Sequence, residues 1–141
     1  MNKKSQPKIK KPNISKLKKE LWKYVSLWVR ERDNYTCYTC GKQGRGSFMH
    51  AGHFINRNHN NTYFDPDNLK AQCITCNLWN YGEGAIFAQK IIAEKGTDFF
   101  NQLVAKGRIV RQWDSKDLLR LIEALKNGED YQAVYEKVIN I

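Results

Sequence analysis

Two Cys-x-x-Cys pairs, Cys37/Cys40 and Cys73/Cys76, constrain the fold of this chain more than any other feature. Four thiolates at this spacing are enough to close a tetrahedral zinc site. Gly41 follows the first pair directly and suits the sharp turn of a zinc knuckle. A redox motif would account for one pair and leave the other unexplained. The spacing therefore predicts structural Zn²⁺, without which the middle of the chain should lose its structure.

Basic residues are concentrated at the N-terminus. The chain has 24 Lys and Arg against 14 Asp and Glu, a formal net charge of +10, and its first 32 residues hold eleven of the basic and two of the acidic ones. Such a segment can neutralise phosphates whatever the base sequence. The alternative is a solubilising segment without a partner. No apolar run reaches the length of a membrane span, and Met1–Pro7 lacks the apolar stretch of a secretory signal, so we expect no membrane partner and a cytoplasmic location.

The pattern of apolar residues divides the chain into four regions. Residues 1–13 read as a flexible basic arm, and 14–34 as a helix with Ser15 as its N-cap. Residues 35–84 are rich in Cys, His, Asn and Gly and show no long helical period. Residues 85–141 return to helical spacing in four pieces, divided at Gly96, Gly107 and Gly128. These last helices form either a small docking subdomain or the outer layer of the core.

All three histidines, His50, His53 and His59, lie between the two cysteine pairs. A single histidine is usually a surface or core residue, but three within ten residues and none elsewhere indicate a site. A neutral imidazole with a pKa near 6.5 can accept a proton from water at pH 7. This segment is therefore the candidate active site.

The residues around these histidines resemble a known family, the phage NinG (Rap) recombination nucleases. The two knuckles around a histidine hairpin, with Asn directly after the last Cys, are also similar to phage endonuclease VII. The resemblance covers about Cys37 to Gly84. It rests on the ordered residues Cys37-x-x-Cys40-Gly41, Ala51-Gly52-His53-Phe54, Arg57, Phe64-Asp65, Asn68, Gln72-Cys73-x-x-Cys76-Asn77 and Gly82.

The resemblance implies a specific fold and activity. The fold would be α+β, with a zinc-stabilised ββα-metal (HNH-type, treble-clef-like) nuclease core over residues 35–84 between the N-terminal helix and the C-terminal helices. The activity would be Mg²⁺- or Mn²⁺-dependent cleavage of branched DNA, such as Holliday junctions and flaps. The expected partner is DNA. A homodimer would suit paired incisions, and phage recombination proteins are further candidate partners.

Three residues are expected to carry the chemistry. His53 is the expected general base, since it occupies the histidine of the family-like string. Asn77 is an expected ligand of the catalytic cation because its amide oxygen suits a hard ion, although a helix N-cap is the alternative. His50 is the expected second ligand, because Gly52 stands where many HNH-type sites have Asp, and its imidazole would favour Mn²⁺. The two histidines would point to opposite faces of a regular strand, so convergence requires a bulge at Gly52. An exchange of their roles remains open.

The remaining candidates are support residues and phosphate contacts. Asn68, at the middle asparagine of the HNH pattern, is expected to hold the hairpin loop through backbone hydrogen bonds. His59 is interpreted as a loop residue, and Asp65 and Asp67 as turn formers beside Pro66. Expected DNA-backbone contacts are Arg57, Lys16, Lys18, Lys19 and Lys23.

The residues and the resemblance together predict a metal-dependent endonuclease, and the resemblance alone implies that it acts on branched recombination intermediates. One rival is a non-catalytic zinc-finger DNA-binding module, which would share the cysteines and the basic arm and leave the histidines idle. A second rival is an HNH restriction or homing endonuclease that acts on linear duplex.

Overall fold

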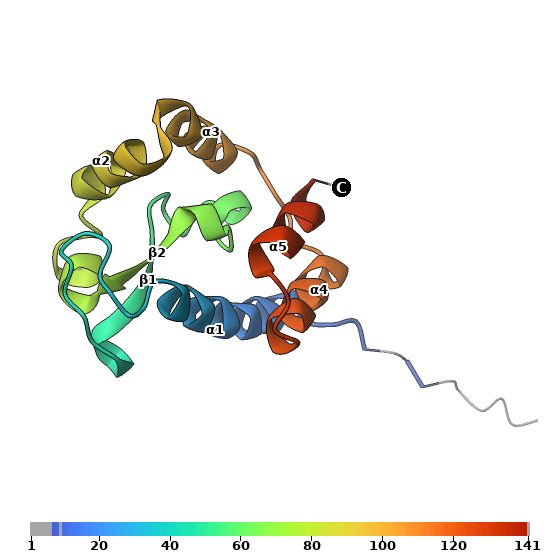
Figure 1. Ribbon diagram of the computed structural model, residues 1–141. Coiled ribbons are helices and arrows are strands. Elements are labelled where there is room, and N and C mark those ends of the chain that lie inside the picture. The colour runs from blue at the N-terminus through green and yellow to red at the C-terminus, as the bar shows by residue number, and fades with distance from the viewer. Residues whose placement is uncertain (1–6, 9, 141) are drawn as a thin grey trace, which may run out of the picture.

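The computed structural model describes residues 7–8 and 10–140, so that residues 1–6 and 9 of the expected basic arm lie outside it. The chain is α+β, as the sequence predicts. Across the described part no helix combines the length and the apolarity that a membrane crossing requires. The helices and strands are α1 (Ile14–Arg32), β1 (Met49–His53), β2 (Leu69–Cys73), α2 (Gly84–Lys95), α3 (Thr97–Gly107), α4 (Ser115–Lys126) and α5 (Tyr131–Ile139) (Figure 1).

Helix α1 begins at residue 14, as expected, but its N-cap lies two residues before the serine expected from the sequence. Asn13, rather than Ser15, is its N-cap, and the Asn13 side chain accepts a hydrogen bond from the backbone of Lys16 (3.2 Å). The helix buries Leu21, Val25 and Val29, which recur every fourth residue and form one apolar face.

Strands β1 and β2 form an antiparallel hairpin in regular register, from Met49 opposite Cys73 to His53 opposite Leu69. The outer edge of β2 is closed by other groups. Tyr38 donates its backbone N–H to Ala71 O (2.8 Å), and the Asp33 carboxylate accepts from Ala71 N (2.8 Å). Within the described residues the sheet has only these two strands, so β1 has an edge without a strand partner.

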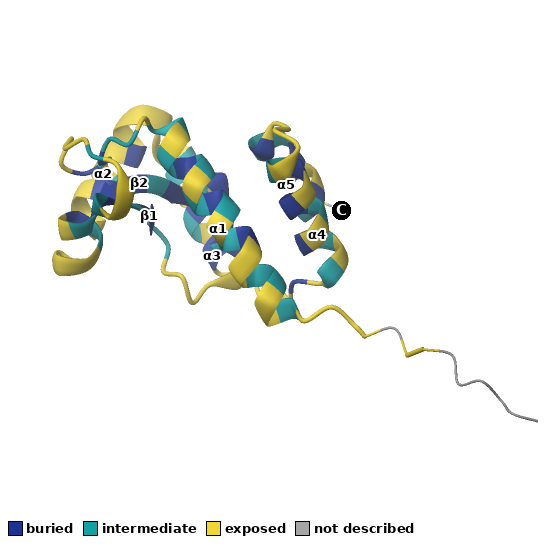
Figure 2. Ribbon diagram, turned by 90° about the horizontal axis from the view of Figure 1, so that it is seen from below, coloured by how far each residue is buried: buried dark blue, intermediate teal, exposed yellow. Residues whose placement is uncertain are grey.

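Helices cover the hairpin on both sides. On one side α1 packs with α4 and α5 around a core that includes Leu21, Leu118 and Tyr131, and Figure 2 shows the buried residues of α4 and α5 on the side that faces α1. On the other side Phe87 of α2 and Leu103 of α3 form a smaller cluster with Phe54 and Ile55, which follow β1.

The four C-terminal helices lie in the order that the apolar spacing predicts. Asp114 and Asp130 cap α4 and α5 through their side chains, and α3 follows Gly96 without a side-chain cap. A carboxylate is among the best N-caps, because it accepts from the free backbone N–H groups of the first turn. Because α4 and α5 supply part of the main core, these helices are the outer layer of the fold rather than a separate docking unit.

Gly52 is required by packing against Gln72, and this yields a stability prediction. A Cβ at residue 52 would overlap the buried Gln72 side chain, so we expect Gly52→Ala to lower the free energy of unfolding by about 1–3 kcal/mol. Gly84→Ala is the matched control, because a Cβ there meets open space at the start of α2 and should leave stability unchanged or raise it by up to about 1 kcal/mol. Urea unfolding of both variants measures the difference. Equal stabilities would contradict the packing argument.

Candidate functional site

The four cysteines converge on one point. Their sulfur atoms all lie within 4.8 Å of one another, with Cys37, Cys73 and Cys76 buried and Cys40 exposed. The Sγ atoms of Cys40 and Cys73 are 3.7 Å apart, close to the edge of about 3.8 Å that a tetrahedron has at a Zn–S distance of about 2.3 Å. The cluster could therefore hold a metal ion, and its geometry is consistent with structural zinc.

Local backbone geometry explains why the sulfurs meet. Gly41 has a φ of +79°, which only glycine adopts without strain, and its N–H donates to Cys37 O (2.9 Å) to close the first knuckle. In the second knuckle Cys73 ends β2, and the N–H of Cys76 points at the Cys73 sulfur (3.5 Å). Cys76 belongs to a single π-helical turn, Thr75–Trp79.

A groove of about 650 Å³ runs beside this cluster. It brings together all three residues that the sequence assigns to the chemistry: His50, His53 and Asn77. Among the described residues that line it, none carries a carboxylate, whereas two arginines do line it. The lining residues are Trp22, Ser26, Arg30, Gly46, Ser47, Met49, His50, Ala51, His53, Asn56, Arg57, Asn77, Leu78, Tyr81 and Gly82.

The two histidines reach the groove without the expected bulge. The register of β1 is unbroken, so that His50 and His53 project from opposite faces of the strand. Both border the groove because it follows the edge of β1 that has no strand partner in the described chain. The expectation of a bulge at Gly52 is wrong, and the glycine instead makes room for Gln72. An aspartate at residue 52 would meet the same overlap, which explains why this position cannot carry one.

His53 is held in a defined orientation. Its ring stacks on Trp22 of α1, with the centroids 4.9 Å apart and the planes at 18°. Its Nε2 lies 2.9 Å from the carbonyl oxygen of Tyr63. A carbonyl can only accept, so Nε2 carries the proton, and in the neutral ring Nδ1 keeps a free lone pair. The pKa of His53 is lowered to about 4, mainly by burial; the Tyr63 carbonyl opposes this shift and the nearby Arg57 charge adds to it. The ring is therefore neutral at pH 7.

His50 and Asn77 contact each other. The Asn77 side-chain amide donates to His50 Nδ1 (3.1 Å). Asn77 lies in the middle of the Thr75–Trp79 turn, so it is not the helix N-cap considered as its alternative role. The turn begins two residues after Cys73, and the second knuckle thus fixes Asn77 beside β1.

Asn68 lies outside the groove and is fully buried. Its Oδ1 accepts from the backbone of Ile55 (2.6 Å), and its Nδ2 donates to the carbonyls of Ile55 and Thr62 (3.0 Å each). These bonds tie both ends of the loop between the strands. Asn68 is therefore placed to support the loop, not to contact a substrate.

Gln72 links the groove wall to both knuckles. Its Nε2 donates to Thr39 Oγ1 (3.2 Å) and to Gly82 O (2.9 Å), while its buried Oε1 has no partner among the described residues. The side chain lies directly beneath Gly52, where a Cβ is absent. The sequence analysis placed Gln72 in the family-like string but assigned it no role, since nothing in its spacing indicates one.

Only some of the expected phosphate contacts lie at a groove. Arg57 lines the main groove and donates to the Tyr63 hydroxyl (3.2 Å). Lys18 and Lys19 line a second hollow of about 450 Å³, which shares Trp22 and Arg57 with the first. Lys16 and Lys23 are exposed on α1 but line neither hollow.

Helix α1 contributes three groove residues that the sequence analysis did not single out: Trp22, Ser26 and Arg30 line the main groove. Ser15 and Lys19 of the same helix line the adjoining hollow, and of these Lys19 was expected as a phosphate contact. These five recur at intervals of four, three, four and four residues, which marks one helical stripe beside the apolar face. That spacing was the signal available in the sequence.

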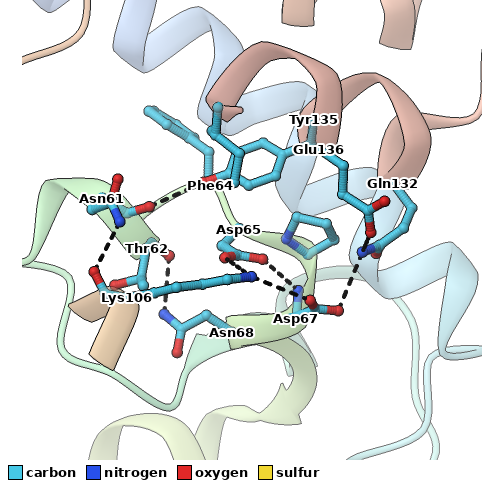
Figure 3. A network of polar contacts seen from close by, with 12 residues as sticks. Asn61, Thr62, Phe64, Asp65, Asp67, Asn68, Lys106, Gln132, Tyr135 and Glu136 are labelled. Atoms are coloured by element: carbon cyan, nitrogen blue, oxygen red, sulfur yellow. Dashed lines mark hydrogen bonds and ion pairs between the residues drawn. The ribbon is translucent and has the colours of Figure 1, made fainter. Parts of the chain in front are cut away.

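The other expected loop residues lie away from the groove. His59 Nδ1 contacts Gly107 O (2.9 Å) at the end of α3. Asp65 accepts from the backbone of Asp67 (2.9 Å), the turn contact expected beside Pro66. Lys106 Nζ lies 3.5 Å from Asp65 Oδ2 and 3.7 Å from Asp67 Oδ2 (Figure 3). Burial raises the pKa of Asp65 to about 6, and the Lys106 charge opposes this rise.

The C-terminal region holds the segment that orients His53. Its aromatic side chains donate hydrogen bonds to backbone carbonyls on both sides of Tyr63, so the Tyr63 carbonyl that binds His53 has a fixed position. Figure 3 shows the bond from Tyr135 to Asn61. The bonds are Trp113 Nε1 to Asn60 O (3.0 Å), Tyr135 Oη to Asn61 O (3.0 Å) and Tyr131 Oη to Phe64 O (2.8 Å).

Removing the metal site should unfold the middle of the chain. We expect the purified protein to carry about one zinc per chain, and Cys76→Ser to lose it together with the tertiary structure around the knuckles, because metal binding supplies folding free energy. Metal analysis and near-UV circular dichroism measure both effects. Thr75→Ser, at an exposed neighbour, is the control. A Cys76→Ser protein with full structure and no metal would contradict a structural role.

The environment of His53 should be visible by NMR. We expect its ring to stay neutral down to about pH 5, with the proton on Nε2, in ¹⁵N spectra. Because its folded pKa of about 4 lies below the ordinary value of about 6.5, the unfolded chain binds more protons between these pH values. The stability that neutral His53 contributes is complete above about pH 6.5 and is lost as the pH falls toward about 4.

Trp22→Ala serves as the comparison for this measurement. It removes the ring that covers His53, so the pKa of His53 should rise toward its ordinary value. Titration of the unsubstituted protein near pH 6.5, or a proton on Nδ1, would contradict the orientation described above.

Comparison with known proteins identifies the family. A family model described as the bacteriophage lambda NinG protein matches residues 1–133. Searches of curated proteins and of solved structures return no match. Since the match spans nearly the whole sequence, the chain belongs to the bacteriophage lambda NinG protein family.

Proposed function

We propose that this protein is a metal-dependent endonuclease that hydrolyses phosphodiester bonds in branched DNA recombination intermediates, such as Holliday junctions and flaps. The observation that carries the proposal is the groove itself. Its described lining combines an oriented neutral histidine, a His–Asn pair and two arginines, and includes no carboxylate. Family membership supports a role in phage recombination.

His53 is the general base in this proposal. Hydrolysis of a phosphodiester needs a group that removes a proton from the attacking water. The Tyr63 carbonyl holds the proton of His53 on Nε2, and Nδ1 is then the atom that accepts the proton from water. Stacking on Trp22 keeps the ring from rotating, which is the orientation that a base requires.

His50 and Asn77 are the proposed ligands of a catalytic cation. Their side-chain atoms are 3.1 Å apart, and two neighbouring ligands of an octahedral cation at about 2.1–2.2 Å lie about 3 Å apart. A half-turn of the Asn77 amide presents its oxygen in place of its nitrogen. When bound, a divalent cation stabilises charge on the scissile phosphate and on the leaving oxygen. The imidazole ligand favours Mn²⁺ over Mg²⁺.

The contacts of the two histidines also support a different role for each. His53 contacts Trp22 and Tyr63, whereas His50 contacts Asn77, the other proposed ligand of the cation. The pairing supports His53 as base and His50 as ligand.

Basic residues define the proposed path of the DNA backbone. Arg30 and Arg57 lie in the main groove, and Lys18 and Lys19 in the hollow that adjoins it. From Ser15 to Arg30 the stripe on α1 spans about 22 Å, enough for about six nucleotides of one strand. These side chains would contact phosphates and would not read bases.

The HNH-type ββα-metal fold, with its similarity to endonuclease VII, is part of the proposal. The order β1, β2 and then the Thr75–Trp79 turn, with cysteines at both knuckles, supports it. The helical element is a single π turn rather than a full helix, which departs from the expected pattern.

A cleavage assay tests the function. We expect full-length protein with Mn²⁺ or Mg²⁺ to cut a four-way junction and a flap in preference to linear duplex of the same sequence. His53→Ala should lower the rate by about 100-fold or more, as expected for loss of a general base, while zinc content and DNA binding persist. His59→Ala is the matched control, since His59 lies outside the groove.

The rivals predict different results. Absence of cleavage on every substrate with either metal would leave a zinc-finger binding module. Sequence-specific cuts in linear duplex would indicate an HNH enzyme of the restriction or homing kind. Full activity of His53→Ala would remove His53 as the base.

A further inference from the structure

We propose that the aromatic turn, defined as residues 78–81, stacks on unpaired bases of DNA whose backbone lies in the groove. This inference rests on the proposed function and deepens it, because it gives a physical basis for preferring branched DNA. The observation behind it is a cluster of large, solvent-exposed side chains at one rim of the groove. Leu78 and Tyr81 of the turn line the groove directly.

The exposure of these side chains is unusual for their type. Tyr81 is 95% exposed, Trp79 74% and Leu78 55%. Within the described chain no packing accounts for the position of the two aromatic rings. Apolar and aromatic groups clustered beside a groove commonly mark a binding surface.

The turn is rigid despite this exposure. Gly82 N donates to Cys76 O and Asn80 N to Thr75 O (2.8 Å each), which fastens the turn to the second knuckle. Gln72 adds a bond to Gly82 O (2.9 Å) from beneath. Tyr81 itself has a φ of +53°, a left-handed conformation that a non-glycine residue adopts only where its surroundings impose it. The rings are therefore presented on a fixed base, which lowers the entropic cost of stacking.

Charge identifies the occupant as a nucleic acid strand. Arg30 and Arg57 line the groove that Tyr81 borders, and no carboxylate does so among the described lining residues. A phosphate backbone in the groove brings its bases to the rim. In continuous duplex the faces of the bases are covered by their neighbours, whereas at a branch point or in a single strand they are open to an aromatic ring. The turn would thus bind branched DNA more tightly than linear duplex.

Binding to abasic DNA tests this directly. Full-length protein, without added Mg²⁺ or Mn²⁺, is titrated by fluorescence anisotropy with a four-way junction and with the same junction carrying abasic nucleotides on both sides of the branch point. We expect the abasic junction to bind roughly fivefold to 100-fold more weakly, the range for loss of base–aromatic stacking. Trp79→Ala/Tyr81→Ala should bind the intact junction with a similar loss, and the abasic junction with no further loss.

Controls separate stacking from other effects. Trp79→Phe/Tyr81→Phe keeps the rings and should retain affinity for the intact junction. Val110→Ala changes an apolar side chain of similar exposure (93%) that lines a separate hollow, and should bind as the unsubstituted protein does. Zinc content and thermal unfolding confirm that each variant is folded.

Two outcomes would overturn the proposal. The first is that the alanine double variant binds the intact junction as tightly as the unsubstituted protein does. This result would point to a protein partner for the turn. The other is a further loss on the abasic junction, which would show that the turn and the bases act independently. Binding is measured without cleavage. A protein that cuts no DNA would therefore refute the nuclease proposal, and the binding data would still test the stacking proposal.

Discussion

The convergence of four sulfur atoms is the constraint on which the rest of the structure depends. The two knuckles are separated by 32 residues in sequence, and their sulfur atoms meet at this cluster. The second knuckle ends β2 and begins the Thr75–Trp79 turn, which sets Asn77 against His50 on the neighbouring strand. The cysteine cluster, and not a large apolar core, therefore sets the position of the groove wall that carries Asn77 and His50.

The opposite side of the groove depends on a different set of contacts. His53 is fixed by Trp22 from α1 and by the carbonyl of Tyr63. The segment around Tyr63 is in turn held by aromatic side chains from the C-terminal region and by Asn68 from the hairpin. Helix α1 thus contacts the site directly, whereas the C-terminal helices affect it indirectly, through the loop between the strands.

Much of the architecture could be predicted from local sequence, and the unpredicted parts share a physical cause. Cysteine spacing predicted the cluster, and apolar periodicity predicted α1 and the four C-terminal helices. Strand periodicity correctly indicated that His50 and His53 face opposite ways. It could not reveal that the groove runs along the edge of β1 that is unpaired in the described residues, where both side chains reach it. The contributions of Trp22 and Gln72 depend on which elements pack together, and no local pattern encodes that.

The closed edge of β2 affects whether two copies of the chain can associate through their strands. Arg32 donates to the carbonyls of Pro66 and Leu69, and Asp33 and Tyr38 occupy the backbone groups of Ala71. A second molecule cannot add a strand there, because the donors and acceptors that such pairing requires are already used. The other edge faces a groove rimmed by arginine, and like charges would repel an approaching copy. The hairpin is thereby protected at both edges against aggregation by sheet extension.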